Sequence, residues 1–235
     1  MKAYTSNNIR NIAVLGHGGK GKTTLCEAML YIAGASDRLG RVADGNTVLD
    51  FDSEEKRRKS SVSSAMAALE WDNTKLNIID APGLFDFEGG AAEAVRAAEA
   101  VLIVTSAGSG VDVGTQKAFR AAEKKGAAKF FAVTKTDSDH RNFYKTFDAL
   151  KEVYGNKLCP TIIPYMEGNI TKCYVNLMTG MAFSYDENGK ATKVPVPEDS
   201  VIEEMTSAFM ELSQPPTTLL WKNSSRVRNS PRRKY

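Results

Sequence analysis

The sequence predicts an α/β fold with a mostly parallel sheet covered by helices on both faces. Short apolar runs without in/out alternation, such as "NIAVLG" and "VLIVTSA", alternate with helical segments, which is typical of parallel strands buried on both faces. Three of these runs end at residues suited to ligand contact: Gly16, Asp80 and Thr134. Ligands of such sheets bind at the carboxyl ends of the strands, so these three positions indicate one site.

The expected elements follow one another along the first two thirds of the chain. "NIAVLG" predicts a buried strand, and "KTTLCEAMLYIAG" predicts a helix that ends at a glycine. About 40 polar residues follow, for which the periodicity indicates no regular element. "KLNIIDAPG", "VLIVTSA" and "KFFAVTKTD" predict three more strands. "AAEAVRAAEA", "GTQKAFRAAEKKG" and the amphipathic "NFYKTFDALKEVYG" predict the intervening helices.

The texture of the sequence changes after residue 158. Residues 1–158 are expected to form the core domain, and 159–200 a small β-containing insertion with short strands and turn signals such as "DENGK". An amphipathic helix is expected over 201–213, with Asp199 or Ser200 as its cap. Residues 214–235 are expected to be a basic, disordered tail.

Composition and charge exclude several classes of protein. The 42% hydrophobic and 25% charged residues are typical of a soluble globular chain, and no apolar run reaches the roughly 18 residues of a membrane helix. The N-terminus has no signal-peptide pattern, and three scattered cysteines indicate reduced thiols in a cytosolic protein. The net charge of +3 comes from the tail, which has six basic and no acidic residues. We therefore expect no membrane and no specific DNA as partner; an RNA-binding role of the tail stays an alternative.

The segment "GHGGKGKTT" fits two phosphate-binding patterns. Gly16, Gly18 and Gly21 match the G-x-G-x-x-G of a dinucleotide fold, whereas the same segment also matches G-x-x-x-x-G-K-[ST], the P-loop. The dinucleotide fold needs an acidic residue at the end of a second strand, and the candidate, Asp37, is not in a strand. The P-loop is favoured. Its phosphate-binding residues are Gly16, His17, Gly18, Gly19, Lys20, Gly21, Lys22, Thr23 and Thr24.

Two further motifs complete a nucleotide site. Lys22 is expected on the outer phosphates and Thr23 on Mg²⁺, with Asp80 holding the ion through water. Gly83, in D-A-P-G, places its N–H near a γ-phosphate. "TKTD" comprises Thr134, Lys135 and Asp137; its aspartate accepts both N–H donors of guanine, a pair that adenine lacks.

Together "GHGGKGKTTL", "DAPGLFDFEGG" and "FFAVTKTD" resemble the N-terminal GTPase domain of bacterial elongation factor G, and most closely its divergent second type. The resemblance runs from about Ile9 to Leu212 and includes the insertion. It implies a P-loop NTPase fold, GTP/GDP and Mg²⁺ as ligands, hydrolysis involving Lys22 and Gly83, a cytoplasmic location, and the ribosome as partner of the full-length factor. "RRKSSVSS" is similar to the first switch, so Arg58 and Ser61 match its arginine and its Mg²⁺-binding threonine.

Three positions depart from the family pattern. Leu84 stands where the family has the histidine that orients the attacking water, which predicts weak hydrolysis. Gly19 replaces an acidic residue, and Thr134 replaces the usual asparagine. A GTPase with weak turnover and a nucleotide-binding remnant without turnover therefore stay open as alternatives.

The end of the sequence also departs from the family. "TSAFM" contains a Ser-Ala pair, but Ser207 is expected in the middle of a helix and not in a guanine-binding loop. We expect a truncated domain that cannot carry out translocation alone. DNA encoding "LLWKNSSRVRN" can give "LMEKFFEGEE" in another frame, which resembles the family's next acidic helix, so we hypothesise a frameshift near Ser213.

Overall fold

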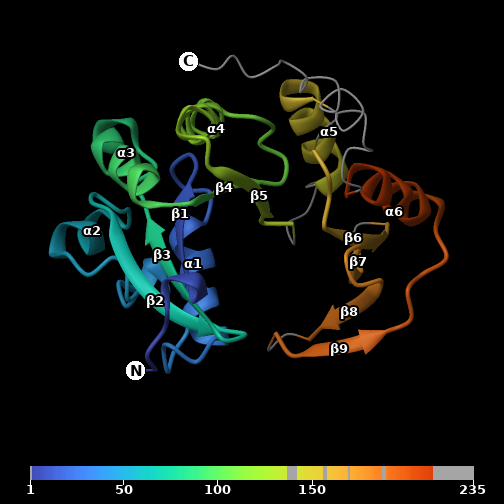
Figure 1. Cartoon of the computed structure of the whole chain (residues 1–235), viewed down its shortest axis with the longest axis horizontal. Coiled ribbons are helices and arrows are strands. Elements are labelled where there is room, and N and C mark those ends of the chain that lie inside the picture. Colours follow the sequence, from blue (N-terminus) through green and yellow to red (C-terminus); the bar gives the residue numbers. More distant parts are fainter. Residues whose placement is uncertain (1, 137–141, 156–157, 169, 187–188, 214–235) are drawn as a thin grey trace, which may run out of the picture. The chain divides into compact units, whose positions relative to one another are not determined.

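The computed structural model describes residues 2–136, 142–155, 158–168, 170–186 and 189–213 (Figure 1). Asp137 and the predicted basic tail, 214–235, lie outside the described residues. The chain divides into two compact units, with the boundary in the sequence between Val153 and Tyr154, and each unit is described by itself. The four-part division of the chain expected from the sequence stays a prediction.

The first unit is built on a five-stranded sheet with the strand order β2-β3-β1-β4-β5 (Figure 1). Its strands are β1 (Ile9–Leu15), β2 (Ala65–Trp71), β3 (Thr74–Asp80), β4 (Ala100–Ser106) and β5 (Ala128–Thr134). β1 pairs in parallel with β3 and β4, and β4 pairs in parallel with β5, whereas β2 is antiparallel to β3. The predicted α/β fold with a mostly parallel sheet is therefore confirmed.

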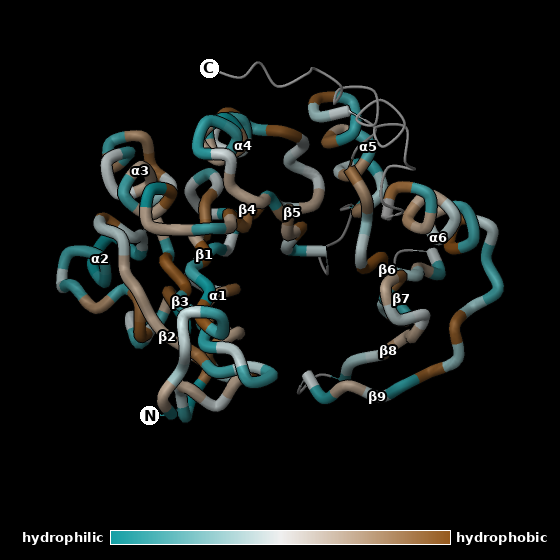
Figure 2. Tube along the Cα trace, viewed as in Figure 1, coloured by the Kyte–Doolittle hydropathy of each residue, from teal (hydrophilic) through white to brown (hydrophobic). Residues whose placement is uncertain are grey.

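Helices cover both faces of this sheet. α1 (Lys22–Ile32) packs on one face, and α3 (Glu88–Ala97) and α4 (Val113–Lys125) pack on the other. The chain also forms the helices α2 (Ser53–Arg58) and α5 (Phe143–Tyr154), and short 3-10 turns η1 (Ser6–Asn8), η2 (Val42–Asp44) and η3 (Phe85–Phe87). On β1, Ala13 and Leu15 pack against α3 and α4, while Val14 packs against Cys26 and Leu30 of α1. Figure 2 shows the hydrophobic residues concentrated along these central strands. Burial on both faces explains why the strands lack alternation.

One expectation for this unit was wrong. The polar stretch after α1 contains the helix α2 and the strand β2, which periodicity did not indicate. Only Ala65 and Leu69 of β2 are buried, and alanine is a poor strand former, so the pattern was weak. The strand β5 forms as predicted, at the edge of the sheet, and its Phe130 is 57% exposed.

The second unit carries the predicted β-containing insertion. β6 (Ile162–Glu167), β7 (Ile170–Asn176), β8 (Met181–Tyr185) and β9 (Ala191–Val194) form an antiparallel sheet in that order. The helix α6 (Ser200–Ser213) follows, and Asp199 Oδ1 accepts a hydrogen bond from the N–H of Val201, 2.8 Å away. Ser207 lies within α6, as expected, and its hydroxyl donates to Glu203 O. Among the described helices, none has the length and apolar character needed to cross a membrane.

Candidate functional site

The loop between β1 and α1 has a backbone that requires glycine. Gly16 has φ +142°, and a Cβ there would lie 2.2 Å from the carbonyl oxygen of Val104. Gly21 has φ +86° and caps α1. A side chain at either position would force the backbone of the loop into another conformation. The loop runs directly into the N-terminus of α1. An N-terminus of this kind, with a glycine-rich turn before it, is suited to binding phosphate oxygens.

The side chain of Lys22 is held inside this loop. It is 6% exposed, and its Nζ donates to the carbonyl oxygen of His17 at 3.2 Å. Burial lowers the pKa of Lys22, while the carboxylate of Asp80 acts in the opposite direction. Gly83 lies directly against the lysine, because a Cβ on Gly83 would be 2.2 Å from Nζ. The structure thus brings together two residues that the sequence predicted to act on the same phosphate.

Two hydroxyls and two carboxylates form a buried cluster beside Lys22. Thr23 Oγ1 donates to Asp80 Oδ2 at 2.6 Å, and Ser61 Oγ donates to Asp50 Oδ1 at 2.7 Å. The two hydroxyl oxygens, Thr23 Oγ1 and Ser61 Oγ, are 3.3 Å apart. Asp80 and Asp50 are 1% and 4% exposed. The three predicted metal ligands, Thr23, Ser61 and Asp80, therefore lie together.

Asp50 is the member of this cluster that the sequence did not reveal. It lies in the polar stretch "TVLDFDSEE", where no motif distinguishes it from its acidic neighbours. Its position depends on how residues 40–64 fold back toward α1, which only the structure shows. The cluster therefore has one more carboxylate than the sequence predicted.

The electrostatics of the cluster favour a cation. Burial raises the pKa of Asp80 to about 7, although the hydrogen bond from Thr23 and the charge of Lys22 act to lower it. Burial also raises the pKa of Asp50. Asp80 Oδ1 and Asp50 Oδ2 are buried, and neither has a hydrogen-bond partner among the described residues. Carboxylate and hydroxyl oxygens suit a hard divalent cation. The cluster has only two carboxylates, and the described residues contain no group of three or more His, Cys, Asp or Glu side chains that could hold a metal.

A cavity of about 200 Å³ opens between these groups. It is lined by residues of the glycine-rich loop and by residues that lie far from it in the sequence, namely Gly18, Gly19, Gly21, Lys22, Thr23, Thr24, Val42, Asp50, Lys59, Ser60, Ser61, Gly83 and Lys135. Residues from six separate stretches of the sequence thus share one polar pocket.

Two residues of the "TKTD" motif, Thr134 and Lys135, contact the backbone of the glycine-rich loop. Thr134 Oγ1 donates to Lys20 O at 2.7 Å, and Lys135 Nζ donates to Gly19 O at 2.7 Å. Both contacts tie the end of β5 to the phosphate loop. Asp137 lies outside the described residues, so its contact with a base stays a prediction.

Three predicted residues have side chains that are engaged elsewhere. Lys20 forms an ion pair with Asp112, at the start of α4. The ring of His17 lies 5.5 Å from that of Phe85, and its Nδ1 is buried without a hydrogen-bond partner among the described residues. Arg58 pairs with Glu54 on the exposed side of α2, 2.5 Å from Nε to Oε1.

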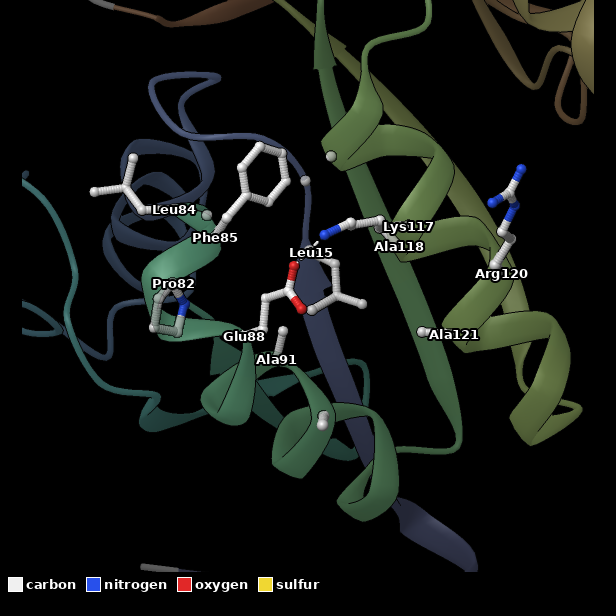
Figure 3. A pocket seen from close by; sticks show the side chains of 14 residues that line it. Leu15, Pro82, Leu84, Phe85, Glu88, Ala91, Lys117, Ala118, Arg120 and Ala121 are labelled. Atoms are coloured by element: carbon white, nitrogen blue, oxygen red, sulfur yellow. Dashed lines mark hydrogen bonds and ion pairs between the residues drawn. The ribbon is translucent and has the colours of Figure 1, made fainter.

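Leu84 lines a second, mostly apolar cavity of about 350 Å³ between α3 and α4, whereas Gly83 lines both this cavity and the polar pocket. A Cβ on Gly18 would lie 3.0 Å from Leu84 Cδ2, so the leucine touches the phosphate loop. Figure 3 shows its side chain pointing away from Phe85, over which Lys117 lies 4.4 Å from the ring centroid. Lys117 also pairs with Glu88. No side chain that can orient water stands at position 84.

Comparison with known families shows which family has this arrangement of residues. The family model described as the elongation factor Tu GTP binding domain matches residues 7–215. The chain belongs to this family. In this elongation factor Tu GTP binding domain, the polar pocket described above is lined by P-loop residues, by Gly83 of D-A-P-G and by Lys135 of "TKTD".

Individual relatives agree with this assignment. The GTP binding domain is 34% identical over 204 residues to an elongation factor G-like protein of Mycobacterium tuberculosis, covering 86% of this chain and 28% of that protein. It is 29% identical to elongation factor G of Mycoplasma genitalium, covering 87% of this chain and 30% of that protein. A crystal structure of a protein from Thermus thermophilus superposes with a TM-score of 0.80 at 35% identity, over 87% of this chain and 30% of that one. The chain thus spans about 30% of the length of these relatives.

Proposed function

We propose that this chain binds GTP and GDP together with Mg²⁺ and hydrolyses GTP slowly to GDP and phosphate. The observation that carries the proposal is the cluster of Thr23, Ser61, Asp80 and Asp50 directly beside the buried Lys22. Two unpartnered carboxylate oxygens in this cluster match the oxygen ligands that Mg²⁺ takes. Guanine selectivity rests on Asp137 with Thr134 and Lys135.

Each residue has a defined task in this proposal. The backbone N–H groups of Gly16 to Thr24 bind the phosphates, Lys22 neutralises the outer two, and the Gly83 N–H contacts the γ-phosphate. Thr23, Ser61, Asp80 and Asp50 hold Mg²⁺, which supplies charge neutralisation between the phosphates when bound. Water attacks the γ-phosphorus while the bond to the β–γ bridging oxygen breaks; GDP leaves with the bridging oxygen, and the proton of the water passes to the phosphate product or to solvent.

Slow hydrolysis follows from Leu84. A leucine cannot hydrogen-bond the attacking water, and absence of a positioning group of this kind costs roughly 10²–10⁴-fold in rate. The alternative, a nucleotide-binding domain without turnover, predicts no phosphate release above the uncatalysed rate. Elongation factor relatives make the ribosome the expected partner of a longer protein containing this domain, acting in the cytoplasm.

The test is calorimetric titration of GDP, GTP and ATP into the full chain with Mg²⁺. Lys22→Ala removes the buried cation, and Lys124→Ala removes an exposed lysine at the end of α4 as the matched control. We expect guanine-selective binding that falls at least tenfold in Lys22→Ala only, because a charge-assisted hydrogen bond contributes about 1.5–3 kcal/mol. Binding that is equal in the two variants would refute the proposal. Phosphate release from GTP then separates turnover from binding alone.

A further inference from the structure

Two glutamates are completely buried although neither belongs to the phosphate loop or to the metal cluster. Glu27, on α1, is 0% exposed, and Glu55, on α2, is 1% exposed. A buried carboxylate destabilises a fold unless its oxygens are hydrogen-bonded. The partners of these two side chains therefore indicate what they do.

Glu27 holds the backbone just before Asp50. Its Oε1 accepts hydrogen bonds from the N–H groups of Val48 at 2.8 Å and Leu49 at 3.1 Å. The other oxygen, Oε2, is buried without a hydrogen-bond partner among the described residues, and the backbone of Gly40 lies close to it, because a Cβ there would be 2.2 Å from Oε2. The carboxylate is thus enclosed by the segment that leads to Asp50.

Glu55 holds the backbone just after Ser61. Its Oε1 accepts from the N–H groups of Val62 at 2.9 Å and Ser63 at 3.2 Å. Its Oε2 accepts from the N–H of Asp52 at 3.3 Å, which completes the capping box at the start of α2. The carboxylate of Glu55 therefore ties the start of α2 to the loop that follows the helix.

The two glutamates act on opposite ends of the same stretch, residues 50–61. One secures the two residues that precede Asp50, and the other secures the two that follow Ser61. Asp50 and Ser61 are joined by their own hydrogen bond of 2.7 Å. We infer that Glu27 and Glu55 are positioning residues that fix Asp50 and Ser61 in the geometry needed to bind the divalent cation. The inference rests on the proposed function, since it concerns the metal of that site.

The experiment compares variants that keep or remove the hydrogen-bond acceptor. Glutamine keeps an acceptor oxygen at the same reach, whereas methionine has a similar length and no such acceptor. The variants are Glu27→Gln, Glu27→Met, Glu55→Gln and Glu55→Met, with Glu93→Met on the exposed side of α3 as matched control. Mn²⁺ binding to the GDP complex is measured by electron paramagnetic resonance, and GDP affinity is measured separately in EDTA.

We expect the two methionine variants to bind Mn²⁺ roughly 10–100-fold more weakly, the range found when groups that orient metal ligands are removed. The glutamine variants should recover most of this loss. GDP affinity in EDTA should stay within about threefold of the wild type, because neither glutamate touches the phosphate loop. In hydrogen exchange, the amides of Val48 and Leu49 should exchange faster in Glu27→Met, and those of Val62 and Ser63 faster in Glu55→Met.

Other results would overturn the inference. If the wild type binds Mn²⁺–GDP and both methionine variants bind Mn²⁺ equally well, Glu27 and Glu55 do not position the metal ligands. A glutamine variant as weak as its methionine partner would contradict the acceptor role. If the wild type binds no GDP, the proposed function itself is refuted. Should a methionine variant not fold, Glu27→Asp and Glu55→Asp make the same comparison, because their carboxylates are one methylene too short to reach both amides.

Discussion

The ammonium of Lys20 lies 3.2 Å from Asp112 Oδ2, which joins the phosphate loop to the start of α4. Both side chains are mostly buried, at 15% and 19% exposed. Asp112 Oδ1 caps α4 by accepting from the N–H of Thr115 at 2.8 Å, and Lys20 Nζ also donates to Ser109 Oγ at 2.8 Å. The side chain of Lys20 therefore links the glycine-rich loop to Ser109 and to Asp112 at the start of α4.

Removing this ion pair should loosen the loop. We expect Lys20→Met to destabilise the chain by about 1–3 kcal/mol, less than the loss of one partner from a fully buried pair. Burial acts to raise the pKa of Asp112, but hydrogen bonds from Thr115 and Lys20 outweigh it and hold that pKa below its ordinary value. The ionised Asp112 therefore stabilises the fold at pH values above the ordinary pKa of an aspartate, and this stabilisation is lost as the pH falls through the lowered pKa of Asp112. A double-mutant cycle with Asp112→Asn in urea checks the coupling, and strictly additive effects would contradict it.

The raised pKa of Asp80 makes metal-free stability depend on pH. Its pKa in the folded chain is about 7, because of burial, against an ordinary value of 3.8. The folded state therefore keeps a proton that the unfolded state releases, so stability is full below about pH 4 and falls as the pH rises to about 7. In EDTA at about pH 8, Asp80→Asn should be more stable than the wild type by about 2–4 kcal/mol.

Saturating Mg²⁺ and GDP should reverse this order, because the cation stabilises only the carboxylate form. Urea unfolding of both proteins at about pH 5 and about pH 8, with and without Mg²⁺–GDP, measures the effect. A wild type whose metal-free stability increases across this range would disprove the shift.

Leu84→His should accelerate GTP hydrolysis. A histidine at this position supplies a side chain that can hydrogen-bond water beside Gly83, so we expect turnover to rise by about 10–10³-fold with GDP affinity unchanged. Leu84→Ala is the matched control, since it removes the leucine without adding a polar group, and its rate should stay near that of the wild type. Single-turnover phosphate release measures all three. If the alanine variant is as fast as the histidine variant, the leucine slows hydrolysis by its bulk and not by its inability to hydrogen-bond water.

Gly83→Ala should disrupt phosphate binding at a defined contact. The added methyl group would lie 2.2 Å from Lys22 Nζ and 2.8 Å from both Gly16 O and Gly18 N, so the lysine or the loop must move. We expect GTP affinity to fall at least tenfold, about 1.4 kcal/mol. Gly89→Ala is the control, because nothing lies within 4 Å of its Cβ and alanine favours the helix α3 by about 1 kcal/mol. Equal GTP affinities in calorimetry would rule out the close approach.

The sequence predicted most of the first unit because its signals are local. Apolar runs and helical spacing marked β1, β3, β4 and their helices, and the P-loop motif marked the residues from Gly16 to Thr24. Motifs predicted Thr23 and Asp80 as metal ligands, the resemblance to elongation factor G added Ser61, and the structure brings the three residues together.

What the sequence could not predict depends on long-range packing. Asp50, Glu27 and Glu55 gain their roles only when residues 40–64 fold against α1, and no periodic pattern records that fold. The edge position of β5 was missed for a similar reason: "KFFAVT" has the composition of a central strand. Composition states how apolar a strand is, but not how many neighbours it has.

The edge position of β5 predicts that the two sides of the nucleotide pocket differ in local stability. The phosphate loop follows β1 and Asp80 ends β3, two strands that have neighbours on both sides. Thr134 and Lys135 instead follow a strand that borders the sheet and whose first three residues are exposed. Edge elements open at lower free energy than the interior of a sheet. As the temperature rises, the selectivity for guanine over adenine should therefore fall at a lower temperature than the affinity for the triphosphate.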